Sequence, residues 1–126
     1  MSWQPIVMDV DRDESVVAGV AGVLSEHGRL DAVITSAGWG LSGPVETTGL
    51  EQARAQVETN FWGTVRVVRE ALPVMRSQGA GRLVLMGSLG GLIGLPFQAY
   101  YSASKFALEG FAEALSHPVT IGVIAG

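Results

Sequence analysis

Two side chains suited to proton chemistry lie four positions apart in the last third of the sequence. Tyr101 and Lys105 fall in a segment with a helical pattern, so their spacing places both on one helix face, within reach of the same ligand. A free phenol ionises at about pH 10, and a nearby ammonium group favours the phenolate. The pair therefore has the residue types of a proton donor and acceptor that works near neutral pH.

Most tyrosine–lysine pairs at this spacing are only neighbours on an exposed surface. Two features favour a site instead. Lys105 is the sole lysine, whereas every other Lys or Arg position carries arginine. The Tyr101 helix also follows a glycine-rich loop from Gly87 to Pro96, which itself follows an apolar run ending beside Ser88.

The elements that must position these residues alternate between short apolar runs and longer helical patterns. Strands are predicted at residues 6–8, 32–34, 83–86 and 119–124. Strands that alternate with helices form right-handed crossovers and a parallel sheet, which predicts an α/β fold. The run 83–86 is of the continuously apolar kind that is buried on both faces of such a sheet.

Three helical regions join the predicted strands. Asp11 with Glu14, and Thr48 with Glu51, are candidate capping boxes for the first two, and Gly28 is a natural end for the first. The second region runs in two pieces to about residue 77, and the third from about 98 to 117. The second carries an apolar stripe typical of core packing: Phe61, Val65, Val68, Leu72 and Met75.

Small and polar residues follow the predicted strands. They are Asp9, Ser36 to Gly38, Ser88 and Gly126. In open parallel sheets ligands bind beyond the carboxyl ends of the strands. This edge of the sheet is therefore the expected place for a site, and it is also where the Tyr101 helix begins.

Composition excludes several classes of protein. The 126 residues suit one domain, and a hydrophobic share of 48% with a charged share of 16% favours a packed core over disorder. The net charge of −4 and the scattered arginines argue against a nucleic-acid partner.

Without cysteine there is no thiol chemistry, and His27 and His117 lack companion ligands, so no metal site is expected. Neither a signal peptide nor a run of about 20 apolar residues is found, which predicts a cytoplasmic protein without membrane contact.

The spacing of four polar residues extends the Tyr101 pattern. Ser88 lies thirteen positions before Tyr101, and Asn60 stands further upstream in Thr59-Asn60-Phe61. Together with Lys105 they resemble the catalytic tetrad of the short-chain dehydrogenase/reductase family. The runs at 81–97 and 104–110 are similar, more narrowly, to the branch of 17β-hydroxysteroid and retinol dehydrogenases. The resemblance extends from about residue 9 to residue 115.

The resemblance implies a role for each member of the tetrad. Tyr101 would be the general acid in carbonyl reduction, or the base in alcohol oxidation. Lys105 would favour its phenolate and bind the nicotinamide ribose, and Ser88 would polarise the substrate oxygen. Asn60 would lie where its helix kinks and anchor a water that links Lys105 to solvent. Hydride would pass between the substrate carbon and NAD or NADP.

The resemblance also implies residues that bind the cofactor. Asp9 and Val10 would contact the adenine, although Asp9 is also a common residue at the turn before a helix. Ser36, Ala37 and Gly38 stand where relatives carry asparagine, alanine and glycine against the cofactor. The serine lacks the amide that pins neighbouring strands, so some local loss of stability is expected.

Parts of the family pattern are absent from the sequence. The Thr-Gly-x-x-x-Gly-x-Gly loop with its βαβ unit does not occur, nor does the substrate-binding part beyond the last predicted strand. The expected fold is a partial Rossmann-like, doubly wound parallel sheet, with residues 1–126 as one partial NAD(P)-binding and catalytic domain. Two missing strands would leave a gap between 6–8 and 32–35. Either residues 1–28 repack, or another segment fills the gap, or the isolated chain folds poorly.

Two functions follow from these expectations. The first is an NAD(P)-dependent oxidoreductase that interconverts a secondary alcohol and a ketone. Apolar residues after Ser88 suit a lipophilic, steroid- or retinoid-like substrate and suit core packing equally: Leu89, Leu92, Ile93, Leu95 and Phe97. The second is a truncated, non-catalytic remnant that acts only as an interaction partner. The family's subunits pair through the helices after Asn60 and at Tyr101, which implies a homo-oligomer, a dimer or a tetramer.

Overall fold

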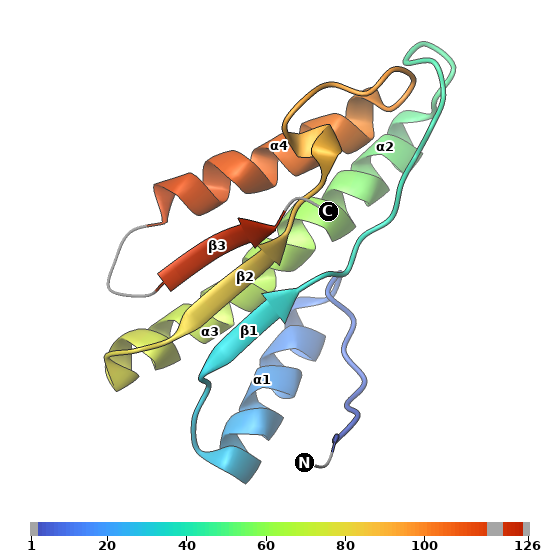
Figure 1. The fold of residues 1–126 in the computed structure, drawn as a ribbon. Coiled ribbons are helices and arrows are strands. Elements are labelled where there is room, and N and C mark those ends of the chain that lie inside the picture. The colour runs from blue at the N-terminus through green and yellow to red at the C-terminus, as the bar shows by residue number, and fades with distance from the viewer. Residues whose placement is uncertain (1–2, 116–119, 125–126) are drawn as a thin grey trace.

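The computed structural model describes residues 3–115 and 120–124, and shows helices alternating with strands (Figure 1). The strands are β1 (Ala32–Thr35), β2 (Arg82–Met86) and β3 (Thr120–Ile124). The helices are α1 (Asp13–His27), α2 (Leu50–Val57), α3 (Thr64–Gln78) and α4 (Ala99–Ala114). A π-helix (Glu58–Gly63) joins α2 to α3, and a single 3₁₀ turn (Leu89–Gly91) follows β2.

The three strands form one parallel sheet in the order β1-β2-β3. Ala32 pairs with Arg82 and Arg82 with Thr120, so all three strands point the same way and end at one edge (Figure 1). The predicted α/β class and the parallel sheet are confirmed. The site expected beyond the strand ends thus has the segments after Thr35 and Met86 side by side.

The prediction of a strand at residues 6–8 is wrong. The segment is irregular, with Ile6 and Val7 exposed. A strand needs a neighbour to complete its hydrogen bonds, and a hollow of about 410 Å³ separates this segment from β1, with Met8 on one side and Ile34 on the other. The gap predicted between these two segments is therefore present as an open hollow beside β1.

Both predicted capping boxes are wrong as well. α1 begins at Asp13 after Arg12, and α2 begins at Leu50 after Gly49, neither with a side-chain cap. The candidate caps are engaged elsewhere: the Asp11 carboxylate accepts a hydrogen bond from Thr59, and the Thr48 hydroxyl donates to the carbonyl of Pro44. The predicted end of α1 is confirmed, because Gly28 takes the left-handed conformation with φ 75°.

The core lies between the sheet and the helices α1 and α3, which pass behind the strands in Figure 1. Val68 and Met75 of the predicted stripe are fully buried there, beside Leu83 and Leu85 of β2. The expectation that β2 is buried on both faces is wrong, because the alternate residues are only half-buried and Ile34 on β1 is 65% exposed. Two right-handed crossovers in one direction put their helices on the same face of the sheet.

The helix ends differ in detail from the prediction. α2, the π-helix and α3 form one continuous helical region to Gln78, and the predicted break is the change in winding at residues 58–63. α4 ends at Ala114, three residues before His117, which lies outside the described residues together with Gly126. Within the described residues no helix is long and apolar enough to cross a membrane.

Candidate active site

A cavity of about 600 Å³ lies beyond the carboxyl ends of β1 and β2. Its lining comes from three segments: the turn after β1, the loop after β2 and the first two turns of α4. Among the lining residues are Ser36, Gly38, Ser88, Tyr101 and Lys105. Three of the four predicted catalytic residues thus meet in one place, and two of these, Tyr101 and Lys105, were also predicted to bind the cofactor, as were Ser36 and Gly38 beside them.

Lys105 is the buried cation of this cavity. It is only 8% exposed, and its Nζ donates to the carbonyl oxygen of Met86 at 3.1 Å. The same Nζ lies 5.9 Å from the centroid of the Tyr101 ring. An ammonium group has three donors. Since Lys105 lines the cavity, the donors that Met86 does not use are available to a bound ligand.

Glycines allow α4 to approach the loop after β2 closely. A Cβ atom at Gly91 would lie 3.0 Å from the backbone oxygen of Lys105, and one at Gly90 would lie 3.1 Å from Cε1 of Tyr101. Ser88 precedes the 3₁₀ turn, and its Oγ accepts a hydrogen bond from the Gly90 N–H at 3.1 Å. The hydroxyl proton of Ser88 therefore stays available for an acceptor in the cavity.

Asn60 lies in the π-helix, where the helical region changes its winding, but it does not line the cavity. Its Oδ1 accepts from the Trp39 N–H at 2.9 Å, and its Nδ2 donates to the Trp39 carbonyl at 2.9 Å and to the Ser104 hydroxyl at 3.1 Å. The side chain thus holds the backbone of the turn after β1. The bound water assigned to Asn60 stays a prediction.

The sequence did not single out three residues around Asn60. Gln56 is fully buried and donates from Nε2 to the Trp39 carbonyl at 3.0 Å. Ser104 is buried and its Oγ donates to the carbonyl of Tyr101 at 2.7 Å. Trp39 itself lines the cavity. The one available signal was the spacing of Gln56 four positions before Asn60, which places both amides on one helix face.

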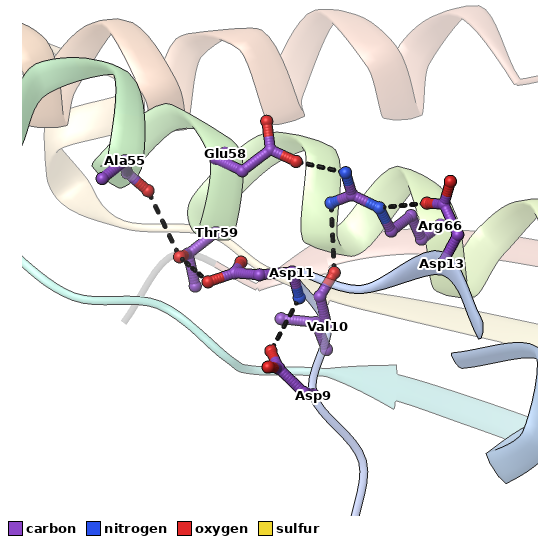
Figure 2. A network of polar contacts seen from close by, with 8 residues as sticks. All are labelled: Asp9, Val10, Asp11, Asp13, Ala55, Glu58, Thr59 and Arg66. Atoms are coloured by element: carbon purple, nitrogen blue, oxygen red, sulfur yellow. Dashed lines mark hydrogen bonds and ion pairs between the residues drawn. The ribbon is translucent and has the colours of Figure 1, made fainter. Parts of the chain in front are cut away.

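The predicted cofactor residues fall into two groups. Ser36 and Gly38 line the cavity, whereas Val10 and Ala37 line the hollow beside β1, which Ser36 also touches. Asp9 is exposed, and its Oδ1 accepts from the backbone N–H of Asp11 at 2.9 Å, as in a turn that leads into a helix (Figure 2). A turn residue before a helix is the second of the two roles that the sequence allowed for Asp9. The hydrogen bond to Asp11 uses only one carboxylate oxygen of Asp9.

A nicotinamide cofactor fits the residues around the cavity. A Cβ atom at Gly38 would lie 2.9 Å from Oδ1 of Asn60 and 3.7 Å from Nζ of Lys105, so the bare backbone of Gly38 forms part of the wall. Backbone without a side chain permits close approach of a ligand. Lys105 supplies buried donors of the kind that bind ribose hydroxyls. Ser36, Gly38 and Lys105 are therefore the residues that would hold the cofactor here.

Two further polar residues have other surroundings. The Tyr100 hydroxyl donates to the Val45 carbonyl at 3.4 Å, on a hollow away from the cavity with Leu50 and Trp62. Tyr100 thus lies outside the lining of the cavity. His27 ends α1 and its ring shares a hydrogen bond with Gln4. The described part of the chain contains no cluster of His, Cys, Asp or Glu residues that could hold a metal ion.

Comparison with known proteins identifies the family of the chain. The pattern of the family described as short chain dehydrogenase matches residues 2–124. The chain is 42% identical over 121 residues to a 3-ketodihydrosphingosine reductase of Bacteroides thetaiotaomicron, covering 94% of this chain and 45% of that protein. It is 44% identical over 115 residues to human 17-beta-hydroxysteroid dehydrogenase type 1, and 41% over 109 residues to human retinol dehydrogenase 8. These two alignments cover 91% and 86% of this chain, but only 34% of each relative.

Solved structures have the same fold. A short-chain dehydrogenase from Streptomyces avermitilis matches with a TM-score of 0.91 and 31% identity, over 95% of this chain and 46% of that one. A metagenomic short-chain oxidoreductase in complex with NADP matches with a TM-score of 0.91 and 26% identity, over 97% and 58%. The Rossmann-like fold is shared, the second of these structures contains NADP, and the family uses NAD or NADP. The chain belongs to the short-chain dehydrogenase/reductase family, and it spans less than half the length of the curated relatives named above.

Proposed function

We propose that residues 1–126 form one partial catalytic domain of an NAD(P)-dependent oxidoreductase that interconverts a secondary alcohol and a ketone. The observation that carries this proposal is the meeting of Ser88, Tyr101 and Lys105 on one cavity with the bare backbone of Gly38. When bound, the nicotinamide supplies or accepts the hydride. The protein's own task is then to orient the substrate and to move one proton.

The proton steps follow from the hydrogen bonds of the cavity. Ser88 Oγ already accepts from Gly90, so its O–H is free to donate to the substrate oxygen. In reduction the Tyr101 hydroxyl gives its proton to that oxygen, and in oxidation the phenolate takes the proton from the alcohol. Lys105, whose buried Nζ lies 5.9 Å from the centroid of the Tyr101 ring, binds the ribose.

The apolar residues of the loop after Ser88 favour a lipophilic substrate. Leu89, Leu92, Ile93 and Phe97 are each more than half exposed, and Leu95 lines the cavity. The sequence suited core packing and substrate binding equally for these side chains. Because most of them are exposed, they favour an apolar rim of the cavity that a ligand can cover. We assign a bulky apolar ketone or alcohol, steroid-like or retinoid-like, as the substrate class.

Exposed apolar side chains on the helices favour association of the chain with further copies of itself. Leu50 on α2, Trp62 in the π-helix and Phe106 on α4 are all largely exposed. α2 and α4 contact each other, so these residues belong to neighbouring elements. A homo-oligomer, a dimer or a tetramer, that covers these helices is the arrangement we propose.

The first test is fluorescence titration of the purified chain with NADH and NADPH, after a cooperative unfolding transition is confirmed. Tyr101→Phe should leave cofactor affinity nearly unchanged and lower turnover by a factor on the order of 10² to 10⁴. Lys105→Ala should lose both cofactor affinity and turnover. Tyr100→Phe is the matched control, because its hydroxyl contacts only the Val45 carbonyl. A folded chain that binds neither cofactor would confine the activity to a longer protein and favour the interaction remnant.

A further inference from the structure

Arg66 joins three segments that are distant in the sequence. It lies on α3, and its side chain is 22% exposed. The guanidinium donates to the carboxylate of Asp13 in the first turn of α1 at 2.5 Å, to the carboxylate of Glu58 at the start of the π-helix, and to the carbonyl oxygen of Val10 at 3.1 Å. Figure 2 shows these contacts converging on one side chain.

Two further contacts tie the same segment to the π-helix. The Thr59 hydroxyl donates to Oδ2 of Asp11 at 3.0 Å, as Figure 2 shows. The Val10 side chain packs on Gly63, where a Cβ atom would lie 2.8 Å from Val10 Cγ2. The irregular segment at residues 9–11 pairs with no described strand, so these contacts, with the hydrogen bond from the Asp9 N–H to Ser15, help to fix its position.

We infer that Arg66 is a positioning residue that holds the Asp9–Val10 segment in place for the adenine end of the cofactor. The inference rests on the proposed function and on the adenine contact that the resemblance to the family implies for Asp9 and Val10. Arg66 donates a hydrogen bond to Glu58 of the π-helix, and the same π-helix contains Asn60. The Asn60 side chain holds the backbone of Trp39 in the wall of the cavity. One side chain therefore sets the distance between the adenine end and the catalytic end of the site.

The chemistry of arginine suits this task. A guanidinium offers five donors in a rigid plane, so it serves three acceptors at once, whereas a lysine ammonium is a single point charge on a flexible stem. Hydrogen bonding to Glu58, and less strongly to Asp13, raises the pKa of Arg66. The group therefore keeps its charge throughout the working range of the protein.

The test compares Arg66→Met with Arg69→Met. Arg69 lies on the same helix, is exposed, and has no hydrogen bond or ion pair to another described residue. Amide hydrogen exchange at residues 9–12 should become about tenfold faster in Arg66→Met, with α4 unchanged, because charge-assisted hydrogen bonds are lost. Arg69→Met should leave both regions unchanged. Unchanged exchange at 9–12, or an equal rise over the whole chain, would overturn the inference.

Cofactor binding gives the second readout. In Arg66→Met the Kd for the preferred dinucleotide, NADH or NADPH, should rise about tenfold, while the Kd for reduced nicotinamide mononucleotide, which lacks the adenosine half, should not change. Arg66→Lys and Thr59→Val should give smaller shifts in the same direction. An equal loss of both ligands would contradict a role at the adenine end. If the unmodified chain binds neither dinucleotide, the proposed function fails for this chain, and hydrogen exchange alone decides the inference.

Discussion

At the scale of single residues, the site depends on polar side chains that do not touch the ligand cavity. The Asn60 amide binds both the N–H and the carbonyl of Trp39, and Gln56 binds the same carbonyl. Three hydrogen bonds from one helix thus fix one residue of the turn after β1. A buried polar group left unpaired costs about 1–3 kcal/mol, so the turn and the helix stabilise each other.

Gly38→Ala tests how closely this turn is packed. The new Cβ atom would lie 2.9 Å from Oδ1 of Asn60, which three hydrogen bonds prevent from moving away. We expect the free energy of unfolding in urea to fall by about 1–3 kcal/mol. Gly40→Ala is the control, because a Cβ atom there has no neighbour within 4 Å. An equal change in both variants would show that Gly38 is not tightly packed.

Phe97 is a strained residue next in sequence to Gln98, which lines the cavity. It takes a left-handed conformation with φ 59°, it is 69% exposed, and its carbonyl accepts a hydrogen bond from Gly43. We expect Phe97→Gly to exceed Phe97→Ala in stability by about 1 kcal/mol, because only glycine relieves the strain.

The same pair of variants separates stability from substrate binding. Both lose the aromatic ring, so both should raise KM for an apolar ketone by about tenfold. Urea denaturation and steady-state kinetics on the two proteins measure the two effects. Equal stability of the two variants would contradict the strain, and an unchanged KM would remove Phe97 from the proposed rim.

Residues whose partners are close in sequence were predictable, and residues with distant partners were not. Tyr101 and Lys105 share a helix, and Ser88 stands at the end of the strand before it, so their order along the chain and the resemblance to the family together predicted that they meet. Arg66 contacts Val10 and Asp13 from more than fifty positions away. No periodicity connects such residues, and only the packing of α1 against α3 brings them together.

At the scale of elements, apolar runs and their order predicted the parallel sheet, whereas side-chain caps were misread. A capping box requires that its side chains have no better partner. Asp11 and Thr48 both have one, in Thr59 and in the Pro44 carbonyl respectively. The false strand at 6–8 has a similar cause, since an apolar run becomes a strand only beside another strand.

Glu14, in the first turn of α1, should make part of the stability of the fold sensitive to acid. The pKa of Glu14 is lowered first by a hydrogen bond to its own backbone N–H and then by Arg12. A carboxylate with a lowered pKa stabilises the fold above its ordinary value of 4.5, and this contribution is lost as the pH falls through the folded value. Urea midpoints should therefore drop between about pH 6 and about pH 3.

Substitution of Glu14 isolates its share of that drop. Glu14→Gln should have a shallower fall of the urea midpoint with acid than the unmodified chain, and Glu46→Gln, in an exposed loop, should keep the full slope. Identical slopes in all three proteins would mean that the first turn of α1 does not contribute.

At the scale of the whole molecule, the described sheet has one covered face and two unpaired side edges, and the edge of β1 borders a hollow. α1 and α3 cover the face that carries Leu83 and Leu85, and β1 pairs only with β2 among the described strands. The hollow of about 410 Å³ continues along the free edge of β1. An unpaired edge with exposed apolar side chains is a template for another strand.

We therefore expect the edge and open face of β1 to form a second contact between copies of the chain, besides the proposed pairing through α2, the π-helix and α4. Sedimentation velocity should show an average mass that rises with concentration, and Ile34→Lys, at a position 65% exposed on β1, should shift this rise to about tenfold higher concentration. Val17→Lys is the matched control, since it also replaces an exposed apolar side chain by a cation, but on α1. An equal shift in both variants would assign the association to general apolar exposure, because the added charge is the same and only the edge differs.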